Sequence, residues 1–173
     1  ARQLAAELDS LNVERREIEQ GMQTEALALL QRLSFQDQSL PDCLCLYQAD
    51  WHQGVIGILA GRVKERYHRP VIAFAKGDDD ELKGSARSVH GVHIRDLLEE
   101  ISSQYPGLIK KFGGHAMAAG LTIAENQLDA FRQALHAVGK KYITPELLTA
   151  VIYTDGELLP QYLTTEVAEL LQQ

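Results

Sequence analysis

The 173-residue sequence has only two cysteines, no hydrophobic run of membrane-spanning length and no excess of positive charge. Cys43 and Cys45 cannot form a disulfide framework, and their spacing suits neither a disulfide nor a CxxC zinc knuckle, so we expect both to be buried strand residues. No segment approaches the roughly 18 uncharged apolar residues of a membrane span, and the polar N-terminus resembles no signal or transit peptide. We therefore expect a cytoplasmic protein, and the initial Ala1 suggests a fragment of a longer chain.

The chain is acidic overall, with 17 Lys and Arg residues, 24 Asp and Glu residues and a formal net charge of −7. This balance argues against a protein that coats itself in nucleic acid. Residues 51–120, however, hold 10 Lys and Arg against 8 Asp and Glu, and five of the six histidines. A phosphate-bearing ligand is therefore expected in this window. The acidic run at 78–81 is interpreted as a solvated hairpin turn rather than a cation site.

A long amphipathic helix is expected at the N-terminus, ending near Ser34. The apolar positions that share one helix face are Leu4, Leu8, Leu11, Ile18, Met22, Leu29 and Leu33. So short a heptad run need not form a coiled-coil dimer. Packing on the rest of the protein, or bridging to another domain, is favoured over self-association.

Strands and helices alternate through the middle of the sequence, which is typical of an α/β domain. Apolar runs predict strands at 43–49, 71–75, 82–89 and 121–124, and helical spacing predicts helices at 54–67, 94–104 and 128–138. Residues 113–120 are expected to form a loop of small residues. The predicted fold class is α/β, with a mixed central β-sheet flanked by helices and preceded by the long N-terminal helix.

Three regions are predicted along the chain: the helical region 1–40, the α/β domain 41–147 and a tail at 148–173. The tail contains a predicted strand at 150–154 and a helix at 164–171 that Thr164 or Thr165 caps. It contains four acidic residues and no basic one, and we interpret it as the truncated start of a further domain.

The most informative segment is KFGGHAMAAG at 111–120. Three glycines and three alanines leave main-chain N–H groups open to close approach by a ligand, and one imidazole offers a hydrogen bond. Two interpretations are equally compatible with these residues. Gly113, Gly114 and His115 form a ligand-binding loop, or the segment is a tightly packed turn in which His115 satisfies a neighbouring carbonyl.

Two other segments carry candidate phosphate ligands. In KGSARS at 83–88, a strand would point Ser85 and Arg87 to the same face, where a hydroxyl and a guanidinium suit a phosphate oxygen. A surface strand with an arginine salt bridge is the commoner arrangement. In WHQGVIG at 51–57, His52 precedes a glycine-containing helix start, which is a candidate anion site, and Arg62 follows on that helix. Trp51 is expected in the core rather than as a stacking platform.

These segments together resemble a known family. WHQGVIGILAGRVKERYHRPVIAFA, LKGSARS and KFGGHAMAAGLTI, in this order, are similar to the DHH-associated domain of the RecJ family of single-strand-specific 5′-to-3′ exonucleases. The GGHxxAAG pattern is typical of the wider DHH phosphoesterase superfamily. The segments WHxGVIGI and GSxRS narrow the resemblance to the RecJ family within it. LNVERREIEQGM resembles the helix that links the catalytic DHH domain to this one, and VIYTDGEL resembles the start of an OB-fold.

The resemblance implies the substrate-gripping part of an enzyme that hydrolyses single-stranded DNA in recombination and repair. It implies that Gly113, Gly114 and His115 contact the strand near the scissile phosphate and that Ser85 and Arg87 bind the terminal 5′-phosphate. Family catalysis uses manganese or magnesium held by the DHH domain, and this sequence lacks the Asp-His-His triplet. We therefore expect an inactive fragment with no catalytic residue, metal or cofactor of its own.

The implied partners are single-stranded DNA and the parent's own catalytic and OB-fold domains, in a bacterial cytoplasm, with no membrane partner. His52 and Arg62 are the remaining candidate substrate-binding residues. His90 and His93 have a spacing that can chelate metal on a helix, but a strand-to-helix junction does not favour that role. Two alternatives remain: a phosphodiesterase of oligonucleotides or cyclic dinucleotides, and a protein-interaction module that binds no nucleic acid.

Overall fold

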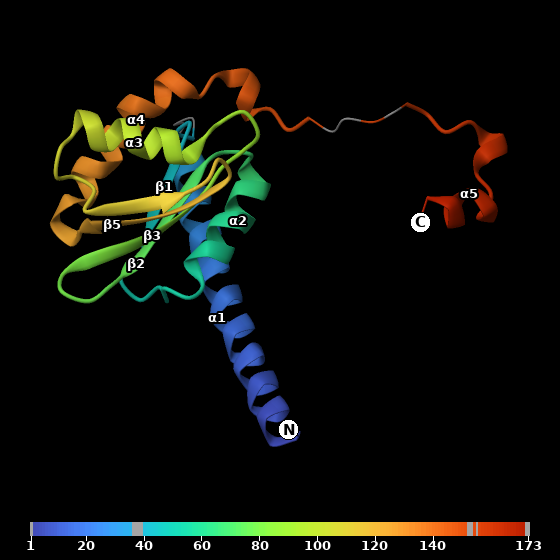
Figure 1. Ribbon diagram of the computed structural model, residues 1–173, viewed down its shortest axis with the longest axis horizontal. Helices are drawn as coiled ribbons and strands as arrows, with labels where there is room; N and C mark the ends of the chain where they lie inside the picture. Colours follow the sequence, from blue (N-terminus) through green and yellow to red (C-terminus); the bar gives the residue numbers. More distant parts are fainter. Residues whose placement is uncertain (1, 36–39, 152–153, 155, 172–173) are drawn as a thin grey trace.

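The computed structural model describes residues 2–35, 40–151, 154 and 156–171. Five strands form one sheet in the order β1-β2-β3-β5-β4 (Figure 1). The strands are β1 (Leu44–Tyr47), β2 (Val71–Lys76), β3 (Glu81–Arg87), β4 (Lys111–Gly114) and β5 (Ala118–Ala124). β1 and β2 are parallel and are connected through α2 (Ile56–Tyr67), whereas the other neighbours are antiparallel. The predicted α/β class with a mixed sheet is confirmed.

Helices cover the two faces of the sheet unequally. α3 (Ile94–Gln104) and α4 (Leu128–Tyr142) pack on one face, where the rings of Phe74 and Phe131 meet edge to face at 5.3 Å. On the other face, α2 packs over β2 and β3 through residues such as Leu59. Lys111 and Gly113 of β4 are exposed, so the β4–β5 half of this face remains open to solvent.

The N-terminal helix α1 (Arg2–Phe35) projects from the body of the molecule (Figure 1). The predicted long helix is confirmed, but its apolar face is only partly packed: Leu4 and Leu8 are exposed, whereas Met22 and Ala26 are buried. Trp51 is 4% exposed, and its indole Nε1 donates to Glu25 Oε2 of α1 at 3.1 Å. The prediction that Trp51 lies in the core is therefore confirmed.

The loop predicted at 113–120 is wrong in its extent. β4 runs to Gly114 and β5 begins at Ala118, which leaves a three-residue turn at 115–117. Pairing of Gly113 with Gly120 supplies the strand, because tertiary context overrides the low strand propensity of glycine. The first strand is also shorter than predicted, and Cys43 lies just before it, although it is buried as expected.

The acidic run at 78–81 forms the predicted hairpin turn between β2 and β3. Asp79 and Asp80 both have left-handed backbones, with φ of 52° and 54°, and the Glu81 N–H donates to the Asp78 carbonyl at 3.1 Å. Two consecutive positive φ values are the signature of a type I′ turn, whose twist matches that of the paired strands. Gly77 and Asp78 both bond to Glu81, so Gly77 is an extra residue and the register along β3 resumes with Lys76 opposite Leu82.

After a short 3₁₀ helix, η2 (Pro145–Leu148), the tail runs away from the sheet to η3 (Pro160–Tyr162) and α5 (Thr165–Leu170) (Figure 1). Thr164 accepts from the Val167 N–H at 3.4 Å, which confirms the predicted cap. The predicted strand at 150–154 includes residues 152 and 153, which lie outside the described residues, and its described residues are not in a strand. The division into three regions stays a prediction. None of the described helices is both long and apolar enough to cross a membrane.

Candidate nucleic-acid interface

The open half of the sheet carries a row of polar and small residues. Residues two apart on a strand share a face, so Lys83, Ser85 and Arg87 of β3 point the same way. In the antiparallel register Ser85 pairs with Gly120, and Gly120 pairs with Gly113. Ser85 therefore lies beside two glycines that leave the backbone of β5 and β4 uncovered, and the three residues form a flat surface across three strands.

Ser85 and Arg87 meet each other and the first turn of α2. The Arg87 guanidinium donates through Nη1 to Ser85 Oγ at 3.1 Å and to the Ala86 carbonyl at 2.9 Å. A Cβ at Gly57 would lie 3.0 Å from Arg87 Nη2 and 3.1 Å from Ser85 Oγ. Gly57 is therefore the residue that lets the helix approach this pair. The salt bridges found in the described part of the chain do not include Arg87.

The start of α2 lies at this corner, and two of its N–H groups, those of Ile58 and Leu59, donate to the Val55 carbonyl at 3.0 Å. Its N-cap, Val55, makes no side-chain hydrogen bond to the first-turn N–H groups. Helix N-termini with free N–H groups favour anions, and a guanidinium beside them strengthens that preference. His52 is exposed and its Nδ1 accepts from the Gly54 N–H at 3.1 Å, so this imidazole also shapes the loop that precedes the helix.

Arg62 is not brought to this corner. Its Nε lies 3.6 Å from Glu19 Oε1, so it joins α2 to α1. Its predicted contact with substrate stays a prediction.

Ser88 lies on the opposite face of the sheet from Ser85, as the alternation along β3 requires. It is buried and donates to the Val92 carbonyl at 2.6 Å, so its role is structural.

His115 occupies the turn between β4 and β5. The His115 N–H donates to the Ala118 carbonyl at 2.8 Å, and its side chain is exposed. No hydrogen bond of this imidazole is found among the described residues, which does not favour the interpretation that it satisfies a neighbouring carbonyl. The preceding Gly114 has a φ of +147°, in a region that L side chains rarely adopt.

The turn is tied to the elements beside it. The Ser88 N–H donates to the Met117 carbonyl at 3.0 Å, and the Ile94 N–H, at the start of α3, donates to the Ala116 carbonyl at 2.9 Å. These bonds join the turn to the end of β3 and to α3. His115 is thus held at the same end of the sheet as Arg87, whose register partner on β5 is Ala118.

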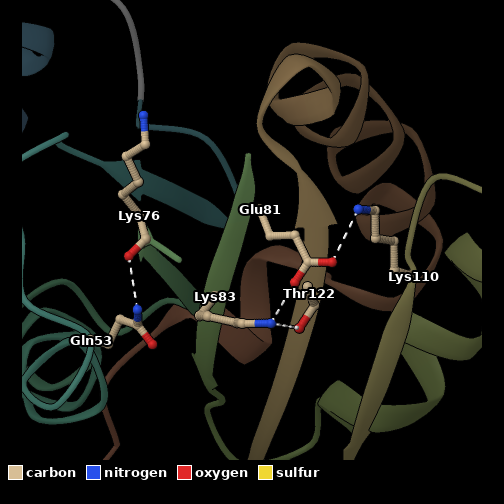
Figure 2. A network of polar contacts seen from close by, with 6 residues as sticks. All are labelled: Gln53, Lys76, Glu81, Lys83, Lys110 and Thr122. Carbon is tan, nitrogen blue, oxygen red and sulfur yellow. Dashed lines mark hydrogen bonds and ion pairs between the residues drawn. The ribbon is translucent and has the colours of Figure 1, made fainter. Parts of the chain in front are cut away.

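Lysines border the other end of the same face. A groove of about 430 Å³ runs over β3, β5 and β4. Its lining residues are Lys83, Gly84, Lys111, Phe112, Gly113, Gly120, Leu121 and Thr122. Lys83 Nζ contacts Glu81 Oε2 at 2.6 Å and Thr122 Oγ1 at 3.4 Å, as Figure 2 shows. The groove therefore joins a rim of two lysines, Lys83 and Lys111, to the exposed glycines.

Sequence reasoning missed Gly57, Lys83, Lys111 and Thr122. The strand alternation that grouped Ser85 with Arg87 also places Lys83 on their face, so that signal was available. Gly57 had no such signal, because its proximity to Arg87 arises only when α2 folds back onto the sheet.

His93 has a structural role at the start of α3. Its Nδ1 accepts from the Asp96 N–H at 3.2 Å and caps the helix. Across the described residues, no group of three or more His, Cys, Asp or Glu side chains is arranged to hold a metal ion. The residues present here do not fit the metal centre that the family resemblance implies for the catalytic domain.

Comparison with known proteins identifies close relatives. The DHHA1 domain model matches residues 41–141. The single-stranded-DNA-specific exonuclease RecJ of Escherichia coli K12 is 52% identical over 172 residues, which is 99% of this chain and 30% of that protein. The protein of the same name from Bacillus subtilis 168 is 35% identical over 149 residues, covering 84% of this chain and 18% of that protein. The chain thus spans less than a third of the length of these relatives.

Solved structures of RecJ proteins are similar to this chain as well. The crystal structure of RecJ in complex with Mn²⁺ from Thermus thermophilus has 29% sequence identity and a TM-score of 0.66, covering 83% of this chain and 20% of that one. A crystal structure of exonuclease RecJ bound to manganese has 28% identity and a TM-score of 0.68, covering 87% of this chain and 35% of that one.

Proposed function

Because the chain belongs to the DHHA1 domain family, we propose that it is the substrate-gripping part of a RecJ-type exonuclease, which hydrolyses single-stranded DNA from its 5′ end in recombination and repair. The observation that carries this proposal is the corner where Arg87, Ser85 and the first turn of α2 meet beside an open sheet face. Its bacterial relatives bear the name of such an exonuclease. A bacterial cytoplasm is part of the proposal.

In this proposal the terminal 5′-phosphate binds at the corner. The guanidinium of Arg87 and the hydroxyl of Ser85 approach one phosphate together, and the N–H groups of Ile56 and Gly57 at the start of α2 serve as additional donors. The support is geometric: the two side chains already share a hydrogen bond, and Gly57 keeps the space between helix and strand free of a side chain. His52, beside the helix start, is assigned to the same end of the substrate.

The bond that is cut lies near His115, at the same end of the sheet as Arg87, and the rest of the strand lies over the exposed glycines. Gly113 and Gly120 present uncovered backbone, and the imidazole of His115 is free to donate to a phosphate oxygen near the bond that is cut. Manganese or magnesium in the parent's catalytic domain supplies metal-assisted activation of water there. The residues of this chain bind and orient the strand beside it. That catalytic domain and an OB-fold complete the proposed set of partners, with single-stranded DNA.

The function is tested by titrating a labelled single strand with the chain at about 50 and 200 mM salt, because each phosphate contact contributes a slope of about −0.7 in log K against log salt. Binding that weakens with that salt dependence supports the proposal. Tighter binding of a cyclic dinucleotide or short oligonucleotide than of a long strand would instead favour the phosphodiesterase alternative. Absence of nucleic-acid binding would favour the protein-interaction module.

We predict that the chain alone does not hydrolyse DNA in millimolar manganese, because its sequence lacks the Asp-His-His triplet and the carboxylates that hold two metals in the family. The measurement is release of nucleotides from a 5′-labelled strand, with a full-length relative as the positive control. Manganese-dependent release by a preparation free of contaminating nuclease would contradict this prediction.

A further inference from the structure

Glu81 stands between the acidic turn and the lysine rim of the groove. One carboxylate oxygen, Oε2, accepts from Lys83 Nζ at 2.6 Å, and the other, Oε1, accepts from Lys110 Nζ at 3.0 Å (Figure 2). These hydrogen bonds, first that from Lys83 and then that from Lys110, hold the pKa of Glu81 below its usual value. Glu81 is therefore an ionised partner shared by two cations.

Lys83 is the cation of this pair that faces the proposed substrate. It lines the groove together with Lys111 and Thr122, and it shares a strand face with Ser85 and Arg87. At about 3.4 Å of rise per residue, Lys83 lies roughly 7 Å along β3 from Ser85 and roughly 14 Å from Arg87. It is within reach of an internal phosphate when the strand's terminal phosphate is held at Arg87.

Lys110 is placed differently. It lines a separate hollow of about 430 Å³ with Asp79, Asp80 and Glu125, and it is not among the residues that line the groove. Its ammonium would remain in acidic surroundings without Glu81. Lys110 therefore holds the Glu81 carboxylate in position. Lys83 is the lysine beside the groove whose positive charge Glu81 neutralises.

We propose that Glu81 restrains single-strand binding by engaging Lys83 in an ion pair that competes with an internal phosphate of the strand. This inference rests on the proposed function, because it concerns the strength with which the same face holds DNA. The pair is half-exposed, with 39% of the Lys83 side chain and 24% of the Glu81 side chain accessible, so phosphate can compete for the lysine. The cost of breaking the pair lowers the net gain from that contact.

The test compares strand binding by the wild-type chain, Glu81→Gln and a matched control, Glu100→Gln, across a salt series. Glu100 also pairs with a lysine, Lys141, at 3.2 Å, but it lies on α3, on the other side of the sheet. Both variants remove one negative charge and keep the side-chain shape. We expect Glu81→Gln to bind about fivefold more tightly at about 0.1 M salt, with a slope steeper by about 0.7, as one added phosphate contact gives. Glu100→Gln should match wild type.

The outcomes separate this inference from the proposed function. The inference alone would be overturned if the wild-type chain bound the strand and Glu81→Gln bound it no more tightly than Glu100→Gln did. Weaker strand binding by Glu81→Gln would overturn it too. Failure of all three proteins to bind would overturn the proposed function and the inference with it. Adding Lys83→Ala to Glu81→Gln should abolish the gain. If the gain persisted in that double variant, the assignment to Lys83 would be wrong.

Discussion

Arg87→Ala is expected to weaken binding of a 5′-phosphorylated single strand by about ten- to a hundredfold, because a charge-assisted hydrogen bond contributes roughly 1.5–3 kcal/mol. The same substitution should barely change binding of a strand that ends in a 5′-hydroxyl. The reason is the corner at which Arg87, Ser85 and the first turn of α2 converge. The measurement is a pair of dissociation constants, with and without the phosphate, for wild type and variant.

Three further variants sharpen this test. Arg87→Lys should recover only part of the loss, because an ammonium cannot supply the paired donors of a guanidinium. Gly57→Ala should weaken 5′-phosphate binding without unfolding the chain, since its Cβ would press on Arg87 Nη2 and Ser85 Oγ. Arg132→Ala, which removes an arginine of α4 paired with Asp129 on the opposite face of the sheet, is the charge-matched control. Equal losses on both strands in Arg87→Ala would show that Arg87 is a general backbone contact, and the role in end recognition would be abandoned.

Gly114→Ala is expected to destabilise the chain by about 2–4 kcal/mol. Its backbone φ of +147° disfavours an L side chain, and the added Cβ would lie 2.5 Å from the Ala119 Cα and would also overlap the Ala118 carbonyl oxygen. Strain of this kind costs on the order of 1–3 kcal/mol, and overpacking costs a similar amount. The measurement is the free energy of unfolding in urea, provided that the transition is two-state.

Gly113→Ala is the matched control, one residue away in the same strand. A Cβ at Gly113 would meet no atom within 4 Å, so its folding free energy should stay within about 0.5 kcal/mol of wild type. If it weakens strand binding while folding normally, that supports the open-face role of this glycine. Comparable destabilisation by both substitutions would contradict the geometric account of Gly114.

The sequence predicts the elements whose pattern is local. The helix at 94–104 is found with the expected bounds, because its apolar spacing and the following Pro106 are read directly from the residues. β4 could not be predicted, because Gly113 and Gly114 have little preference for a strand and acquire one only by pairing with β5. The apolar face of α1 was predicted as one stripe, although among its described side chains only Ile18, Met22 and Ala26 pack against the rest of the protein.

In the candidate site, too, some residues could be predicted from a local pattern and others could not. Ser85 and Arg87 were grouped from strand alternation, which is a local rule, and the structure brings them into contact. The approach of Gly57 to this pair depends on how α2 crosses back over β3, and the shared pairing of Glu81 depends on Lys110, 29 residues further along the chain. Contacts between distant segments are fixed by the packed sheet and leave no pattern in either segment alone.

The hydrogen bonds that anchor the turn at 115–117 have a thermodynamic consequence. This turn is bonded within its hairpin through Ala118, to the end of β3 through Ser88 and to α3 through Ile94. A segment fixed at three points has already lost most of its conformational freedom before any ligand arrives. The backbone that carries His115 is therefore preorganised, and in the proposed function docking a strand there costs less ordering entropy than docking on a mobile loop would.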